Sequence, residues 1–194
     1  IERLQRIVTS QFGACDVCVF GSLRAGCALP TSDVDVTLIG HQFPTGSVRG
    51  KPALAAPLRR LDQLLRASNT AFRGELRSSR GVGMSGCLAL PNARVPIIKW
   101  SDWHTGIDID ISFNMMDGAL TSQWVRERIE AWPCFRPLLL VLKMLLKQRG
   151  LADPATGGVG SVTLAVMLSA FLRTRAKQYR TARDRRAKVS FDPA

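Results

Sequence analysis

The chain has 194 residues, of which 27 are Lys or Arg and 15 are Asp or Glu, so its formal net charge is +12 at pH 7. This length is enough to bury a hydrophobic core and suits one domain or slightly more. The excess of positive charge favours a polyanionic partner, nucleic acid before membrane. A soluble protein with a solvated basic face would have the same composition.

The five cysteines are an odd number. Cys15 and Cys18 form a single C-x-x-C pair, so the sequence supports neither a disulfide framework nor a zinc site. Reduced cysteines predict an intracellular, reducing location, and the nucleus and the mitochondrion both suit a basic protein. The longest apolar runs, residues 138–142 and 162–172, are too short to span a bilayer, so no membrane partner is expected.

The N-terminal part of the chain predicts a helix followed by two strands. Residues 1–12 place apolar side chains on one face and predict an amphipathic helix that ends at Gly13 and packs on a sheet. Residues 16–20 and 33–39 are expected to form strands. A turn or short helix is expected over residues 21–30, between the two strands.

The rest of the chain predicts more strands and then only helices. Residues 54–67 carry leucines at helical spacing, which predicts a helix on the outer face of the sheet. A sheet of about five strands with mixed directions follows from three further strands, expected over residues 84–90, 95–100 and 107–113. Helices without intervening strands are expected over residues 120–132, 136–149 and 161–175.

These elements predict an α+β fold, in which a mixed sheet with flanking helices is joined to an all-helical second domain. The catalytic domain is expected over residues 13–116. The helical domain is expected to combine residues 1–12 with residues 117–194. Residues 173–188 hold eight basic residues and one acid, a run that fits a solvated helix end or a nucleic-acid contact.

Asp33 and Asp35 lie two residues apart at the start of a predicted strand, after a Gly21-Ser22 turn. Because strand side chains alternate between faces, both carboxylates are expected on the same side. Carboxylates this close repel each other unless a cation lies between them, and hard oxygen ligands suit Mg²⁺ or Mn²⁺. The stretch therefore predicts half of a metal site with a phosphate-holding turn beside it.

A second acidic pair, Asp108 and Asp110, alternates with isoleucines in the predicted strand over residues 107–113. The isoleucines predict that the other face of this strand is buried, so both acids point to one place. One of them is expected to complete a cluster of three carboxylates with Asp33 and Asp35. The alternative is a pair of ordinary acids that face solvent.

Two further features fit a triphosphate. Lys143 and Lys147 lie four residues apart on an otherwise apolar helix, so both ammonium groups are expected on one face, unless they only extend from a buried helix to water. The glycine-rich residues 156–161 precede a helix, whose N-terminal N–H groups attract anions. The alternative for this loop is a flexible connection that ends in Ser161 as a helix cap.

These residues resemble a known family. Gly21-Ser22, ten residues, Asp33-x-Asp35 and, far downstream, Asp110-Ile-Ser-Phe-Asn114 are similar to the catalytic signature of polymerase-β-type nucleotidyltransferases. Within that superfamily, the resemblance is to the non-canonical poly(A) polymerases and terminal uridylyltransferases. It extends from about residue 17 to residue 172, through motifs at residues 95–99, 110–114, 136–143 and 148–158.

The resemblance implies a polymerase-β-like fold and a two-metal mechanism, in which Asp33 and Asp35 hold both Mg²⁺ or Mn²⁺ ions and Asp110 holds the one that activates the RNA 3′-hydroxyl. The family also implies residues that bind the nucleoside triphosphate. They are Gly21 and Ser22 at the triphosphate, Lys143 and Lys147 at its distal phosphates, Ser161 as a further hydroxyl, and Thr121 or Ser122 at the ribose.

The chain also departs from the family. Val162 stands where relatives commonly have a tyrosine that stacks on the incoming base, and such a stack contributes about 1–3 kcal/mol. The family's helical domain continues beyond the helix over residues 161–175, and the chain starts at Ile1 without Met. We therefore expect a fragment or processed form whose helical domain is incomplete at its C-terminal end.

The function implied is template-independent transfer of AMP from ATP to an RNA 3′ end, with protein partners that supply further RNA binding. Three alternatives remain open at the level of sequence. The first is a terminal uridylyltransferase that uses UTP, the second is a catalytically inert RNA-binding relative, and the third is a nucleotidyltransferase that acts on a small molecule. The charge of +12 counts against the third alternative.

Overall fold

The structure is a computed structural model and describes residues 1–43, 52–70, 86–93 and 95–189. The chain divides into two compact units, Ile1–Trp124 and Val125–Ala194. The first unit contains the sheet and the helices that cover it, and the second contains helices only. The helix α4 (Asp117–Ala131) runs across the division.

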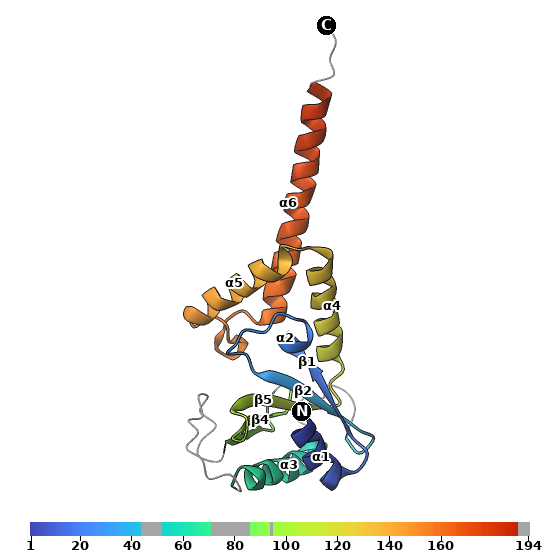
Figure 1. Cartoon of the computed structure of the whole chain (residues 1–194), viewed down its shortest axis with the longest axis vertical. Coiled ribbons are helices and arrows are strands. Elements are labelled where there is room, and N and C mark those ends of the chain that lie inside the picture. Colours follow the sequence, from blue (N-terminus) through green and yellow to red (C-terminus); the bar gives the residue numbers. More distant parts are fainter. Residues whose placement is uncertain (44–51, 71–85, 94, 190–194) are drawn as a thin grey trace. The chain divides into compact units, whose positions relative to one another are not determined.

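A five-stranded sheet in the order β1-β2-β5-β4-β3 forms the centre of the first unit (Figure 1). The β2 and β5 strands are parallel, and the other neighbouring strands are antiparallel. The prediction of about five strands with mixed directions is therefore confirmed. The strands are β1 (Asp16–Phe20), β2 (Val34–Ile39), β3 (Cys87–Leu90), β4 (Ile97–Asp102) and β5 (Ile107–Phe113).

Three strands begin later than predicted. The β2 strand begins at Val34, so Asp33 precedes it by one residue. The β4 strand begins at Ile97 instead of residue 95, because Pro96 has no N–H to donate to a neighbouring strand. The β3 strand begins at Cys87, and residues 84 and 85 of the predicted strand lie outside the described part of the chain.

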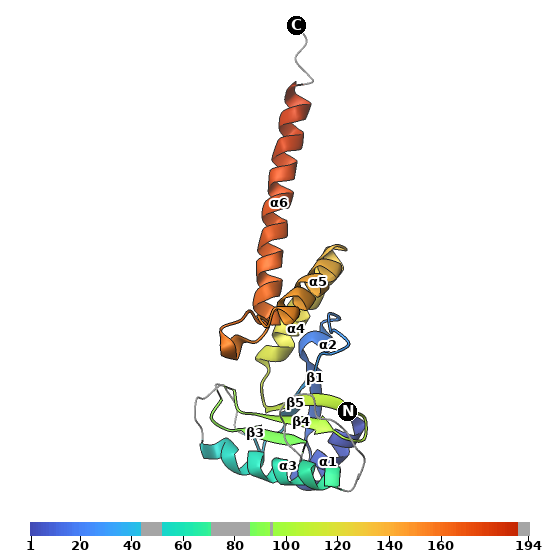
Figure 2. The same ribbon diagram turned by 90° about the vertical axis from the view of Figure 1, so that its left-hand side faces the viewer.

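Two helices, α1 (Glu2–Phe12) and α3 (Pro52–Thr70), cover the same face of the sheet (Figures 1 and 2). Burying one leucine or isoleucine side chain contributes roughly 1.5–3 kcal/mol, so this layer is the main source of stability of the unit. The helices contribute Leu4, Val8, Leu54, Leu58, Leu61 and Leu65 to the core, and the sheet contributes Val36, Leu38, Ile98, Trp100, Ile109, Ile111 and Phe113.

The position of α1 differs from the predicted domain division. Leu4 and Val8 are 1% and 0% exposed in the core under the sheet. Arg3 pairs with Asp102 of β4 and donates to the Ser68 carbonyl of α3 at 3.0 Å. In this structure residues 1–12 therefore belong with the sheet and not with the later helices, because their apolar face is buried there. The predicted catalytic limits of residues 13–116 stay a prediction.

The second unit continues from α4 into α5 (Phe135–Gln148), a short 3₁₀ turn (Pro154–Thr156) and α6 (Ser161–Val189). Buried side chains of α5 and α6 include Phe135, Leu139, Leu164, Ala165 and Leu168. The α6 helix is longer than the predicted helix over residues 161–175. Its extension is rich in Arg, Ala and Lys and contains neither Gly nor Pro, so nothing in it ends a helix.

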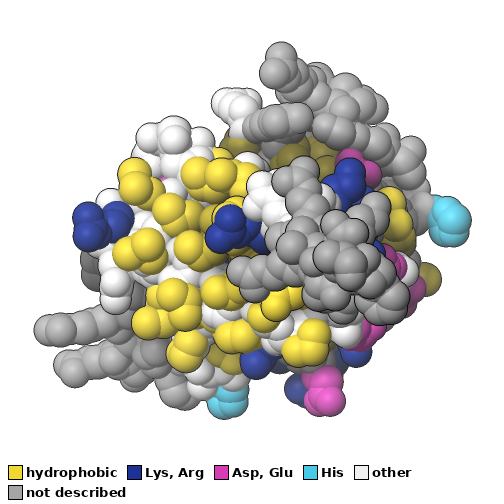
Figure 3. Space-filling model, turned by 90° about the horizontal axis from the view of Figure 1, so that it is seen from above, with side chains coloured by type: hydrophobic (Ala, Val, Ile, Leu, Met, Phe, Trp, Pro, Cys, Tyr) yellow, Lys and Arg dark blue, Asp and Glu magenta, His cyan; other side chains and the backbone are white. Residues whose placement is uncertain are grey.

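The outward faces of α5 and α6 expose large apolar side chains. A space-filling view of the molecule shows one face on which many hydrophobic side chains gather around separated Lys and Arg side chains (Figure 3). Across the described parts of the chain, no helix combines the length and the apolar character that a membrane span requires. The exposed apolar residues of the two helices are Leu138, Val141, Met144, Leu145, Val162, Val166, Met167 and Phe171.

Candidate active site

A row of directly opposed residues crosses the sheet. Phe20 of β1 pairs with Asp35 of β2, and Asp35 pairs with Asp110 of β5. Asp110 in turn pairs with Lys99 of β4, which pairs with Leu88 of β3. Opposed residues of neighbouring strands point to the same face, so the two carboxylates and the ammonium group lie side by side.

This face is the one opposite to α1 and α3. The residues beside the row in sequence, Val36, Ile98 and Ile111, are all 0% exposed in the apolar core. Asp35 and Asp110 are half-buried. Strand alternation therefore assigns one face to stability and the other to polar side chains. The further polar residues that alternate onto the second face are Thr37, Ser101, Asp108 and Ser112.

Gly21 brings the turn after β1 into contact with Asp35. It is the first residue of the one-turn helix α2 (Gly21–Arg24) and has a φ of +68°. A Cβ atom at Gly21 would lie 1.9 Å from the Oδ2 atom of Asp35. Only glycine fits here, because it tolerates the left-handed conformation and also leaves space for the carboxylate.

Ser122 holds this turn from the first part of α4. The Gly21 N–H donates to the Ser122 Oγ atom at 2.7 Å, and that hydroxyl donates to the Gly118 carbonyl at 2.5 Å. Ser122 is only 3% exposed. The Thr121 hydroxyl, for its part, donates to the Asp117 and Gly118 carbonyls at 3.0 Å. Ser122 thus has a positioning role that sequence reasoning missed, and a ribose contact by Thr121 or Ser122 stays a prediction.

Lys99 is a second residue whose role sequence reasoning missed. Its Nζ atom lies 2.8 Å from the Oδ2 atom of Asp110, and the two side chains are 32% and 18% exposed. The ammonium group therefore neutralises one carboxylate of the row. The available signal was a lysine inside an apolar strand, but its partner depends on the pairing register of β4 and β5.

The other two acids lie outside the row. Ser101 is directly opposed to Asp108, and its hydroxyl donates to the Asp108 carboxylate. Asp33 precedes β2, and continuing the β2–β5 register by one residue sets it opposite Asp108. Asp110, and not Asp108, is thus the acid that lies beside Asp35, as the family resemblance implies.

The acidic face carries the right donors for a divalent cation. Carboxylate oxygens are the ligands that Mg²⁺ and Mn²⁺ prefer, and two carboxylates are directly opposed on neighbouring strands. Within residues 1–43, 52–70, 86–93 and 95–189, no group of three or more His, Cys, Asp or Glu side chains lies close enough to hold a metal ion. Lys99 supplies a positive charge beside Asp110.

The residues that follow Asp110 build the strand pair that carries the acids. The Ser112 hydroxyl donates to the Val36 carbonyl at 3.1 Å. The Asn114 side-chain amide donates to the Gly40 and Phe43 carbonyls at 3.0 and 2.7 Å, and Asn114 has a positive φ of 47°. The Asp-Ile-Ser-Phe-Asn motif thus combines one acid, two core residues and two side chains that tie β5 to β2.

The remaining predicted nucleotide-binding residues lie in the second unit. We expected two emerging ammonium groups on α5, but Lys143 is only 8% exposed, whereas Lys147 is exposed. Ser161 is the first residue of α6, and Val162 beside it is 45% exposed. The binding roles of these four residues stay predictions.

Two cysteines on the core side have altered acidities. Burial, followed by the charges of Asp16 and Cys18, raises the pKa of the Cys15 thiol to about 11. Burial and a hydrogen bond with Asp62 raise the pKa of the Cys87 thiol as well. Both groups stay protonated at neutral pH, so neither resembles an activated nucleophile. The structure describes all five cysteines, and none of them forms a disulfide.

The mixed sheet and its flanking helices define the class of protein, a polymerase-β-like nucleotidyltransferase fold. Residues 1–126 match the family described as "Poly(A) RNA polymerase, mitochondrial-like, central palm domain". This match covers more than half of the chain. The chain belongs to that family.

Two curated relatives illustrate the range of the family. Poly(A) RNA polymerase CID14 of Cryptococcus neoformans is 28% identical over 182 residues, which are 93% of this chain and 21% of the relative. The inactive non-canonical poly(A) RNA polymerase protein Trf4-2 of Drosophila melanogaster is also 28% identical over 182 residues and is covered to 40%. The chain thus spans between a fifth and two fifths of these relatives.

Solved structures agree with the fold. The polymerase core of TRAMP, an RNA surveillance complex, superposes with a TM-score of 0.67 at 27% identity, covering 85% of this chain and 45% of that one. The Cid1 poly(U) polymerase with Mg and 3′-dATP bound gives a TM-score of 0.62 at 20% identity and covers 86% of this chain and 45% of that one. The second likeness shows the fold alone.

Proposed function

We propose that this chain forms the catalytic part of an RNA 3′-terminal nucleotidyltransferase that transfers AMP from ATP to the 3′ end of RNA. The observation that carries the proposal is the direct opposition of Asp35 and Asp110 beside the Gly21 turn. Membership of the poly(A) RNA polymerase palm family supports adenylate transfer. The net charge of +12 supports a polyanionic substrate.

In this reaction the RNA 3′-oxygen attacks the α-phosphorus of ATP, the bond between the α-phosphorus and its bridging oxygen breaks, and pyrophosphate leaves. Asp33, Asp35 and Asp110 would hold divalent cations. Bound cations would neutralise the triphosphate and favour the deprotonated 3′-hydroxyl.

The turn after β1 has a divided role in this proposal. The N–H of Gly21 is engaged by Ser122, so Gly21 contributes the space that Asp35 needs and not a donor to phosphate. Ser22, which is half-exposed, is the residue of the turn that would bind the triphosphate through its hydroxyl. We assign Lys147, the exposed lysine of α5, to the distal phosphates.

We also propose that protein partners extend the RNA-binding surface. A solved relative is the polymerase core of an RNA surveillance complex, which supports action within an assembly. The compartment in which the protein acts stays a prediction.

The test is extension of a labelled RNA primer by the purified protein, with Mg²⁺ and each nucleoside triphosphate supplied separately. We expect extension with ATP and none by Asp110→Ala. Asp108→Ala is the matched control, because Asp108 lies on the same strand and face but pairs with Ser101. This control should extend the primer like the wild type.

The proposal fails if the wild type extends no primer, or if Asp110→Ala extends it as well as the wild type. Preference for UTP over ATP would make the protein a uridylyltransferase. RNA binding without any metal-dependent turnover would identify an inert relative, a state that the family includes.

A further inference from the structure

A cavity of about 800 Å³ lies within the second unit, between the end of α4, the start of α5 and the middle of α6. It contains none of the residues assigned above to the acidic face or to the nucleotide. Its lining includes Trp132 and Cys134 beside Leu172, Arg175, Tyr179 and Arg180. We propose that this cavity binds one or two nucleotides of single-stranded RNA, an inference that rests on the proposed function.

The wall formed by α6 changes chemistry along one helical face. Leu164, Ala165 and Leu168 are buried under α5, and the same face continues at helical spacing to Leu172, Arg175 and Tyr179. An apolar protein partner would favour more apolar residues along this continuation. Its replacement by arginine and tyrosine favours a ligand with both flat rings and negative charge.

The aromatic groups suit stacking on bases. Tyr179, the only tyrosine in the chain, is 78% exposed at the cavity. Trp132 is half-buried, and its ring lies 6.0 Å from that of Phe135, which is fully buried. Trp132 therefore packs beside a buried ring and leaves part of its own ring exposed at the cavity. Stacking between a base and an aromatic side chain is tolerant of sequence, so this site would not select one RNA sequence.

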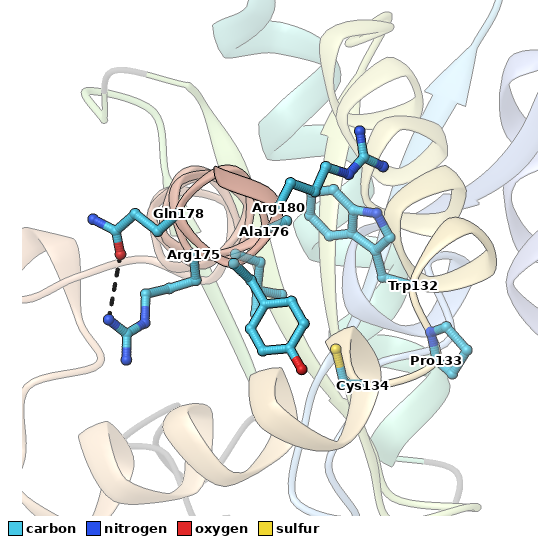
Figure 4. Close-up of a pocket in the computed structure, with 9 residues that line it drawn as sticks. Trp132, Pro133, Cys134, Arg175, Ala176, Gln178 and Arg180 are labelled. Carbon is cyan, nitrogen blue, oxygen red and sulfur yellow. Dashed lines mark hydrogen bonds between the residues drawn. The ribbon is translucent and has the colours of Figure 1, made fainter. Parts of the chain in front are cut away.

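The charges around the cavity have one sign. Arg175 and Arg180 project from different sides of α6, with Arg180 toward the side of Trp132 (Figure 4). Arg175 donates to the Gln178 side chain at 3.4 Å and lies 5.9 Å from the centre of the Phe171 ring. None of the described lining residues is acidic. The first acid in the sequence of α6 is Asp184, so the helix along the cavity has a positive field that favours phosphate.

The experiment measures the affinity of the purified protein for a fluorescein-labelled oligoadenylate by anisotropy, at several salt concentrations and without divalent cations or nucleotides. Arg175→Gln/Arg180→Gln should weaken binding at least about tenfold and reduce the salt slope by about 1.4, because each phosphate contact on a single strand contributes about 0.7. Tyr179→Leu should weaken binding about fivefold or more, while Tyr179→Phe should bind like the wild type.

The matched control is Arg173→Gln/Lys177→Gln. It removes the same two charges from exposed positions of the same helix, but neither residue lines the cavity. Equal losses in the two double variants would mean a diffuse attraction of RNA to a basic helix and would overturn the proposal. Unchanged RNA affinity in all cavity variants would also overturn it and would leave protein docking as the use of the cavity.

A second measurement, with AMP in place of the oligonucleotide, distinguishes a site for an RNA strand from a site for a free nucleotide. If AMP binds the wild type as tightly as the oligonucleotide does and is lost in the same variants, the cavity is a nucleotide site and the proposal fails. RNA affinity requires no turnover in this assay. If the cavity variants alone lose RNA affinity but the wild type extends no primer, only the proposed function fails. If the wild type extends the primer but the cavity variants show no selective loss of RNA affinity, only the cavity assignment fails.

Discussion

The two faces of the central sheet are built from alternate residues of the same strands but meet different demands. Toward α1 and α3, Val36, Ile98 and Ile111 are fully buried. One position away, Asp35, Lys99 and Asp110 form a charged row on the other face. Mutations of neighbouring residues on one strand should therefore have different effects, on stability for the buried face and on catalysis for the charged face.

The largest expected effect is on the charged face. Asp110→Asn keeps the shape of the side chain but removes the charge of the acid opposite Asp35, so primer extension should fall about 10³-fold, as for loss of several kcal/mol of transition-state stabilisation. Its thermal stability should change little, because a partly exposed ion pair such as Lys99–Asp110 contributes about 0–1 kcal/mol. A large loss of stability of Asp110→Asn, measured by thermal unfolding, would contradict the separate roles of the two faces.

The neighbouring residue should behave in the opposite way. Ile111→Ala opens a cavity in the core and should lower the free energy of unfolding by about 2–5 kcal/mol. Denaturant unfolding followed by circular dichroism measures this loss. At a temperature where the variant is still folded, its primer extension should stay close to that of the wild type, and a loss as deep as that of Asp110→Asn would contradict the comparison.

The core face should respond to alkaline pH through Cys15. Its pKa is raised from an ordinary value of 9.0 to about 11, so above pH 9 the unfolded chain releases the thiol proton before the folded chain does. The free energy of unfolding should fall by about 2 kcal/mol between pH 9 and pH 11. Cys15→Ala is the control, since a variant without the thiol should lack this part of the pH dependence. The same slope in both proteins would assign it to other groups.

The smallest expected effect distinguishes two glycines with similar backbones. Gly21 and Gly26 have φ values of +68° and +77°, so alanine should strain both positions by about 1 kcal/mol. A Cβ atom at Gly21 would collide with Asp35, whereas one at Gly26 meets nothing within 4 Å. Primer extension should therefore fall about tenfold for Gly21→Ala, as an estimate for a displaced catalytic group, but not for Gly26→Ala. Equal rates in the two variants would show that the contact with Asp35 is dispensable.

Much of the sheet could be predicted because its sequence signals are local. The alternation of isoleucine and aspartate over residues 107–113 predicts both a strand and the face that is buried. Gly21, Asp35 and Asp110 could be grouped by their resemblance to a family motif, and the structure brings these three together. Local periodicity and motif spacing therefore account for the centre of the site.

Features that depend on distant contacts could not be predicted in this way. The hydrogen bond from Gly21 to Ser122 joins residues 101 positions apart. The pairing of Lys99 with Asp110 requires the register of β4 and β5, which a sequence alone does not provide. The β2 strand begins at Val34, one residue after the predicted start at Asp33. Sequence patterns define the ends of an element less precisely than its centre.

The ion pair between Lys99 and Asp110 also bears on whether the sheet needs a bound metal in order to fold. Many small metal-binding domains fold only when the metal binds, and chelators unfold them. Here a lysine from the neighbouring strand already balances one acid of the row at 2.8 Å. Chelation of the proposed cations should therefore abolish primer extension without unfolding the sheet, because this charge pair is formed without a metal.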